Sequence, residues 1–590
     1  MRDFFKYVFA SAIGFILGSF LLFGLLMVLL TAAITTLSSE SEVDVADGSV
    51  LQLRLDQPFS ERTSKNPFRN LDFSNLGTTN TLGLTDIIKN IEKAKRDPHI
   101  KGILLDLSTV PAGMASMEAI RSSLNDFKKS GKFIYSYGEY YSQGAYYLAT
   151  VSNRIYLHPQ GAIDFKGLHA ELMFFKGALD KLEIEPQIIR HGKFKSAIEP
   201  FILDKMSSEN REQMQVMMDG LWNHLVQQIS TSRAIPVDSL HAMANAFDGR
   251  NPETALTKKL VDRVAYYDEL LADLQQACNW KKDEKPKMIA VNKYDKSSVK
   301  SDRPFSNKKI AVIYAVGEIG EGEGSDEKIG SATTAGEIRK ARLDTSIKAI
   351  VLRVNSPGGS ALASDVIWRE IMLAKKAKPV VASMGDYAAS GGYYIACAAD
   401  SIVAEPTTIT GSIGVFGLLF NAQKMFNNKL GITFDTVKTS HFADIGSMSR
   451  PMRDDERAMI QREIEHVYDV FISHVADGRR MSKANVDSIG QGRVWTGTDA
   501  VRLGLVDRIG TLQDAIEVAA KLARLDNYRT IELPRQKELL EELMQDLNVE
   551  AVTYFAKKEL GENYRYYSEF KKLINEQGIM ARMPYYADIR

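Results

Sequence analysis

Short apolar runs alternate with amphipathic stretches along the chain, most clearly in its second half. Three runs there are apolar and rich in β-branched residues, as expected for buried strands: IAVIYAVGEI (310–319), AIVLRV (349–354) and PVVASMG (379–385). The stretches between them, TAGEIRKARLD and ALASDVIWREIMLAKK, have helical spacing. This βαβαβ order predicts an α/β fold with a mainly parallel sheet and crossover helices.

The chain contains a long internal repeat. DYAASGGYYIA (386–396) resembles EYYSQGAYYLA (139–149), at an offset of 386 − 139 = 247 residues. At the same offset DTSIKAIVL faces DPHIKGILL, and LVDRV and LVDRI occur near the ends of the two halves. The duplication predicts two tandem domains, at 48–279 and 309–530.

Three segments lie outside the repeats. Residues 280–308 are rich in Lys and Ser and are predicted to be a linker, and residues 531–590 are predicted to form a helical tail. The apolar segment 7–36 exceeds the about 20 residues that a helix needs to span a bilayer. We expect a retained transmembrane anchor rather than a cleaved signal peptide, although a cleaved segment would leave the compartment unchanged.

The charges around that segment predict its orientation. Arg2 and Lys6 precede it, and four acidic residues follow it between positions 40 and 47. The positive-inside rule then places the N-terminus in the cytoplasm and the domains on the extracytoplasmic, periplasmic side of the inner membrane.

Composition excludes several classes of protein. Lys+Arg and Asp+Glu are both 74, so a net charge of zero gives no sign of a nucleic-acid partner. Two cysteines cannot build a disulfide framework. We find no metal-binding motif and no phosphate loop, since the glycine-rich GEIGEGEGSD carries acidic residues that would repel phosphate. No cofactor or metal is expected.

Two glycine-rich motifs, SPGGS and AASGGYY, follow predicted parallel strands where helices begin. Ligand sites of open α/β sheets collect at such positions. We expect the backbone N–H groups of Gly359 and Gly391 to form an oxyanion hole, with Ser390 as the nucleophile. The alternative is that Ser390 is a helix N-cap. Its counterpart in the first repeat is Gln143, and the glycine loop has become VPAGM there, which favours a catalytic set lost as a unit.

A serine nucleophile needs a base. His441 and His191, in corresponding regions of the two halves, are histidine candidates, and a buried, neutral lysine is the other option. RHGKFKSAIEPF of the first half aligns with KTSHFADIGSMS of the second, so that Lys195 faces Ala443. Each copy thus retains one half of a Ser/Lys pair, as a single shared site would leave them. Lys193 is a second candidate, and Ser412 in TGSIGV could position the amine.

PGGS, AASGGYY and TGSIGV in the second half, with FKSAIEPF in the first, resemble the long bacterial form of the signal peptide peptidase A family. The resemblance covers about residues 48–530 and the anchor. It implies a membrane-anchored Ser/Lys endopeptidase of ClpP/crotonase-like fold that degrades cleaved signal peptides and assembles as a homotetramer. It also implies that Ser390 is the nucleophile, that Lys195 is the general base and that Ser412 hydrogen-bonds the lysine.

Other functions remain open at this point. The same dyad could act on other membrane proteins. An acyl-CoA enzyme of the same broad fold would use a similar oxyanion hole, but the predicted anchor argues against its cytosolic setting. In a membrane scaffold, both copies would have lost their chemistry.

Overall fold

The computed structural model describes residues 43–64, 82–299, 305–536 and 578–583, with isolated N-terminal positions and the short strands β2 (Leu71–Asp72) and β3 (Gly77–Thr78). Apart from a few positions, the predicted membrane segment 7–36 lies outside the described residues. Within the described parts of the chain, no helix is both long and apolar enough to cross a membrane.

The first repeat is built on a parallel six-stranded sheet. Its inner strands are almost continuously apolar, as expected for strands covered by helices on both faces. The covering helices include α2 (Leu84–Arg96) and α3 (Met114–Lys128) on one face and α10 (Tyr267–Cys278) on the other. The strands, in sheet order, are β8 (Arg263–Val264), β6 (Arg154–Ile163), β5 (Phe133–Tyr141), β4 (Ile100–Asp106), β1 (Ser49–Leu53) and β9 (Met288–Ala290).

The second repeat builds a similar sheet, which confirms the predicted tandem α/β architecture. An equivalent tyrosine anchors each copy: Tyr146 Oη donates to the Leu260 carbonyl and Tyr393 Oη to the Leu505 carbonyl, both over 2.8 Å. The strands, in sheet order, are β19 (Val494–Thr496), β17 (Ile409–Gly411), β15 (Val380–Ala389), β13 (Ile347–Ser356), β10 (Lys309–Val316) and β21 (Arg529–Leu533), with β16 (Ser401–Ala404) and β20 (Arg508–Ile509) beside β15. Its helices include α12 (Ser331–Leu343), α13 (Ala361–Lys375) and α18 (Leu512–Leu522).

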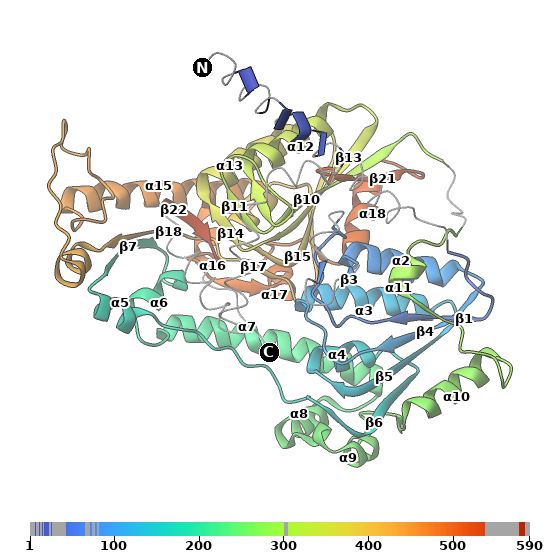
Figure 1. Ribbon diagram of the computed structural model, residues 1–590. Coiled ribbons are helices and arrows are strands. Elements are labelled where there is room, and N and C mark those ends of the chain that lie inside the picture. Colours follow the sequence, from blue (N-terminus) through green and yellow to red (C-terminus); the bar gives the residue numbers. More distant parts are fainter. Residues whose placement is uncertain are drawn as a thin grey trace.

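A third sheet joins the two halves of the chain. β7 (Glu185–His191) leaves the first half and pairs antiparallel with β18 (Val415–Asn421) over seven residues. Figure 1 shows β7, β18 and β22 (Gly578–Arg582) together near α15 (Asp454–Arg479). The other strands of this sheet are β12 (Lys328–Gly330), β11 (Glu318–Gly320) and β14 (Gly358–Ser360).

Buried polar contacts also hold the repeats together. The carboxylate of Asp386, within the second repeat's β15, accepts hydrogen bonds from the Ser116 backbone N–H (3.0 Å) and hydroxyl (2.6 Å) near the start of α3. The fully buried Arg353 pairs with Glu61 at 3.1 Å. Because breaking a buried pair leaves a charge without compensation, these contacts fix one repeat against the other.

The linker and the tail contain structure that the sequence did not predict. Within the predicted linker, Met288–Ala290 forms the edge strand β9 and is followed by the short helix α11 (Val291–Tyr294). The predicted helical pattern of the tail lies largely outside the described residues. The tail's described part instead contributes the end of β21 and the whole of β22. The short strands β9 and β22 are stabilised by pairing with strands that are distant in sequence.

Candidate active site

Ser390 lies in a sharp turn between β15 and α14 (Gly391–Ala396). Its backbone has φ 54° and ψ −114°, a conformation that few non-glycine residues adopt, and such strain is concentrated at functional sites. The turn is held by the Ser390 N–H, which donates to the Gly411 carbonyl over 2.8 Å. The Ser390 hydroxyl makes no capping hydrogen bond to α14, so the N-cap alternative is not what the structure shows.

The structure brings Lys195 to this serine. Lys195 Nζ lies 2.8 Å from Ser390 Oγ, and both side chains are fully buried. Burial lowers the pKa of Lys195 well below its ordinary value of 10.5, because an ammonium loses its hydration there and no carboxylate hydrogen-bonds to it among the described residues. A lysine with a lowered pKa can be neutral and can accept the serine proton.

Ser412 provides the remaining contacts of the amine. Lys195 Nζ lies 3.1 Å from Ser412 Oγ and 3.2 Å from the Ser412 carbonyl oxygen. A neutral amine has two N–H groups and one lone pair. If the two Ser412 oxygens accept the N–H groups, the lone pair faces the Ser390 hydroxyl. Ser412 itself is held at φ 48° by a 2.7 Å hydrogen bond from its N–H to the Arg493 carbonyl.

The backbone around Lys195 depends on a close approach at Gly492. A Cβ placed on Gly492, which has φ 83°, would lie 2.7 Å from Lys195 Cα, so only glycine fits there. The neighbouring Phe194 N–H donates to the Gln491 carbonyl over 3.0 Å. These residues were not predicted from the sequence, where their only signal is the glycine-flanked turn IGQGR.

The two glycine loops meet beside Ser390. Gly358 has φ 105° and Gly359 has φ 155°, so each adopts backbone geometry that favours glycine. A Cβ on Gly358 would lie 2.8 Å from the Gly391 backbone nitrogen. The loop of Gly359 and the helix start at Gly391 therefore converge next to the serine, as an oxyanion hole requires.

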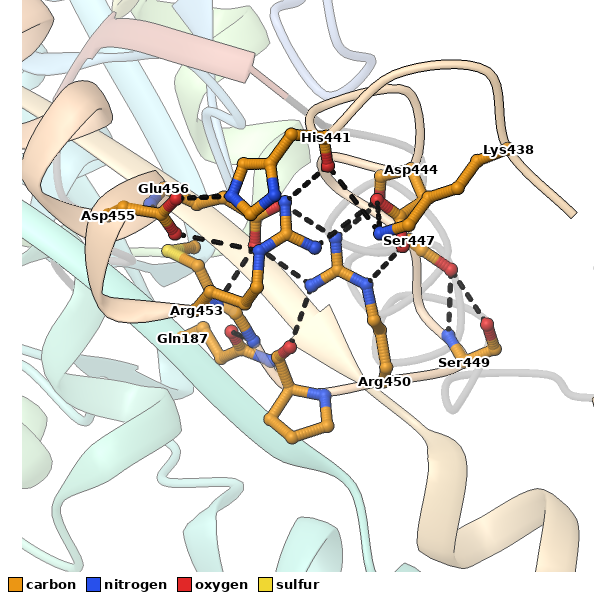
Figure 2. Close-up of polar contacts among 12 residues, drawn as sticks. Gln187, Lys438, His441, Asp444, Ser447, Ser449, Arg450, Arg453, Asp455 and Glu456 are labelled. Carbon is orange, nitrogen blue, oxygen red and sulfur yellow. Dashed lines mark hydrogen bonds and ion pairs between the residues drawn. The ribbon is translucent and has the colours of Figure 1, made fainter. Parts of the chain in front are cut away.

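The other candidate bases do not reach the serine. His441 is in an exposed loop, where its Nε2 lies 2.5 Å from Asp455 Oδ2. Figure 2 shows it within a cluster of ion pairs formed by Lys438, Asp444, Arg450, Arg453, Asp455 and Glu456. His191 stacks on Tyr468, and Lys193 is exposed, with its Nζ 5.3 Å from the centre of the Phe194 ring. Among the candidates, Lys195 alone contacts Ser390.

A strained serine beside a buried lysine and converging glycine loops is the arrangement expected of a serine hydrolase. The family model for peptidase family S49 matches residues 126–281 and 372–526, one segment in each repeat. The chain therefore belongs to peptidase family S49, and it is a serine peptidase of the long signal peptide peptidase A type. This membership argues against the acyl-CoA enzyme and the inactive scaffold.

Named relatives agree with the family. Protease 4 of Salmonella typhi is 42% identical over 454 residues, which cover 75% of this chain and 73% of that protein. Protease 4 of Haemophilus influenzae is 39% identical, covering 74% of this chain and 72% of that protein. The chloroplastic serine protease SPPA of Arabidopsis thaliana is 35% identical, covering 77% and 67% respectively.

Proposed function

We propose that this peptidase cleaves peptide bonds at one composite site shared by its two repeats. Ser390 is the nucleophile, Lys195 the general base, and Ser412 positions the lysine. The N–H groups of Gly359 and Gly391 bind the oxyanion. The observation that carries the proposal is the 2.8 Å contact between the fully buried Lys195 Nζ and Ser390 Oγ.

The reaction proceeds by acyl transfer. Neutral Lys195 accepts the Ser390 proton as Oγ attacks the peptide carbonyl, and the two backbone N–H groups stabilise the negative oxygen; losing one such donor typically costs about 10²–10³ in rate. The protonated amine then gives its proton to the leaving nitrogen. Water, activated by the same lysine, attacks the acyl-enzyme and releases the new carboxylate.

We propose hydrophobic peptides, including cleaved signal peptides, as substrates. The strand β18 beside the site belongs to a buried apolar cluster with residues of the first half. The cluster includes Leu179, Ile198, Phe201, Phe416 and Leu418. The strand next to the site is therefore apolar, which agrees with a hydrophobic substrate. Other membrane-protein segments of the same chemistry are alternative substrates.

The setting of the enzyme is also a proposal. We propose that each repeat has the ClpP/crotonase-like fold, that segment 7–36 anchors the chain in the inner membrane with the domains outside the cytoplasm, and that the enzyme is a homotetramer. Exposed apolar side chains around residues 430–448 support a contact between subunits; Val437 is 99% exposed, and Leu430 and Phe434 are about half exposed.

A fluorophosphonate probe and a fluorogenic hydrophobic peptide test the site on the purified full chain. We expect Ser390→Ala to abolish labelling and to lower peptide hydrolysis by about 10⁴–10⁶-fold. The matched control is Gln143→Ala at the equivalent position of the first repeat, which should change hydrolysis less than twofold. Labelling that survives Ser390→Ala would reject Ser390 as the nucleophile.

A further inference from the structure

The long helix α7 (Ser208–Arg233) belongs to the first repeat but packs against the second repeat next to the serine. Its apolar side chains form one cluster with residues of β15, β17 and β19, among them Ala389, which precedes Ser390. At Gly220 the helix comes so close to β19 that an added Cβ would lie 3.1 Å from Thr496 Cγ2. The helix is therefore fixed against the strands that position the nucleophile.

One buried polar side chain on α7, Gln213, connects the two repeats. It is 1% exposed, and its Nε2 donates to the Phe194 carbonyl over 3.1 Å and to the Ser196 hydroxyl over 2.9 Å. These two residues flank Lys195 in the chain, so one amide group holds the backbone on both sides of the lysine. On its other side, the Gln213 Oε1 accepts a hydrogen bond from the Val494 N–H over 3.4 Å.

The backbone at Val494 positions both serines of the site. The preceding residue, Arg493, accepts the Ser412 N–H at its carbonyl over 2.7 Å. Val494 itself is the ladder partner of Gly411, whose carbonyl accepts the Ser390 N–H over 2.8 Å. The amide of α7 therefore joins the loop of the general base to the strands that hold the nucleophile and the lysine-positioning serine.

A second layer of buried contacts fixes the direction in which the Gln213 amide points. The Glu199 carboxylate, on a residue 1% exposed, accepts from Asn210 Nδ2 over 2.9 Å and from the Ser207 hydroxyl over 2.5 Å. Asn210 therefore presents its Oδ1 to Gln213, which donates to it over 3.2 Å. A reversed Gln213 amide would place oxygen against oxygen at this buried position, so its nitrogen stays on the side of the Lys195 loop.

We propose that Gln213 is a positioning residue for the general base, which it holds in place relative to Ser390 and Ser412 by bridging the two repeats. The inference rests on the proposed function, because it concerns the lysine of that same site. Without the amide, the Lys195 loop loses its hydrogen bonds to α7. A misplacement of about 1 Å can cost about 10²-fold in rate. A looser loop also admits water to the amine, and hydration raises the lysine pKa towards its ordinary value, since burial is what lowers it.

Hydrolysis of a fluorogenic peptide by the purified full chain, measured over a range of pH, tests the proposal. Gln213→Met keeps the length of the side chain but removes its hydrogen bonds. We expect it to lower kcat by about 10–10²-fold with KM within about twofold, and to move the acidic limb of the pH–rate profile to higher pH. Ser196→Ala removes only one of these bonds and should give a smaller change in the same direction. Gln215→Met, at an exposed position of the same helix, is the matched control and should behave like the wild type.

The other outcomes separate this inference from the proposed function. If Gln213→Met lowers the thermal stability but keeps the wild-type kcat and pH–rate profile, its role is structural only and the inference is overturned. A rise in KM at unchanged kcat would assign Gln213 to substrate binding and would overturn it as well. Should Gln213→Met fail to fold, Ser196→Ala decides, and an acidic limb at the wild-type position would then contradict the inference. Probe labelling that survives Ser390→Ala would instead reject the proposed function, whatever the Gln213 variants show.

Discussion

The two repeats share a scaffold and the glycine at Gly391 and Gly144, but they differ at the other positions that the chemistry needs. Where the second repeat has the strained Ser390, the first has Gln143 inside helix α4 (Gln143–Ala149), with no positive φ. The Gln143 side chain bonds to backbone: Oε1 accepts from the Gly167 N–H (3.0 Å), and Nε2 donates to the Gly167 carbonyl (3.1 Å). The equivalent position has thus become a structural contact.

The glycine loops differ in the same way. Gly358 and Gly359 align with Pro111 and Ala112, and proline cannot adopt the φ of 105° seen at Gly358. The first-repeat loop instead receives the second repeat: a Cβ on Gly113 would lie 2.1 Å from Asp386 Cγ. The loop of the first repeat thus forms part of the interface between the repeats, next to the Ser116–Asp386 contact.

The largest expected effect comes from removing what the first repeat contributes to the second. Lys195→Met keeps an unbranched apolar side chain of similar length but has no proton acceptor, so we expect peptide hydrolysis to fall by about 10⁴-fold or more. Steady-state kinetics of the purified chain measures this. Lys193→Met, two residues away and exposed, is the matched control and should stay within twofold of the wild type. Equal losses of peptide hydrolysis in Lys195→Met and Lys193→Met would contradict the assignment of Lys195 as the general base.

A smaller effect is expected at Ser412, which contacts the lysine from the second repeat. Ser412→Ala should lower kcat by about 10²-fold with little change in KM, because the amine is less well oriented. It should also move the ascending, acidic limb of the pH–rate profile to lower pH, since an acceptor for the Lys195 ammonium is lost and the lysine pKa falls further. Ser488→Ala, which changes an exposed serine of helix α16 (Lys483–Ile489), is the control. If Ser412→Ala lowers the stability of the fold but leaves the pH–rate profile unchanged, the role of Ser412 is structural only.

The shared site should also destabilise the fold in a pH-dependent manner. The pKa of Lys195 is lowered in the folded state, so below 10.5 the unfolded chain binds more protons, and stability rises with pH between the folded pKa and 10.5. Over that range the unfolding free energy of the wild type should rise by about 1.4 kcal/mol per pH unit more than that of Lys195→Met. Denaturant titrations at several pH values measure the difference. Parallel curves for the two proteins would mean that Lys195 is not buried as a neutral amine.

The last prediction is that a substitution in the first repeat leaves probe labelling unchanged. Restoring the hydroxyl by Gln143→Ser in a Ser390→Ala background should give no probe labelling, because Pro111 and Ala112 cannot form the oxyanion hole and Ala443 offers no amine. The single variant Ser390→Ala is the control. New labelling at position 143 would show that the first repeat has lost only its nucleophile.

The sequence predicted the parts of the site that lie in repeated or ordered motifs. Ser390 and Gly391 follow a strand that periodicity identifies, and comparison of the copies singled out Lys195. The spacing of residues in the sequence does not show which loops are exposed. His441 was therefore excluded as the general base only by the structure, which places its loop at the surface. Gly492 could not be found because it approaches Lys195 from almost 300 residues away in the chain.

The short strands were the main elements of the fold that the sequence did not predict. MIA in the linker and GIMAR in the tail are too short to show a period, and each is stabilised by pairing with strands distant in sequence. For β22 the loss mattered most, since this strand pairs with β14, the loop of Gly359, and with β18.

The most direct test of the shared site is the rate of fluorophosphonate labelling as a function of pH, with the labelled residue identified by mass spectrometry. We predict labelling at Ser390 alone, at a rate that rises with a pKa well below 10.5 and that His441→Ala leaves unchanged. Lys195→Met should remain unlabelled over the whole range. Labelling of Ser390 that persists in Lys195→Met, or that disappears in His441→Ala, would contradict a proton transfer between the two repeats.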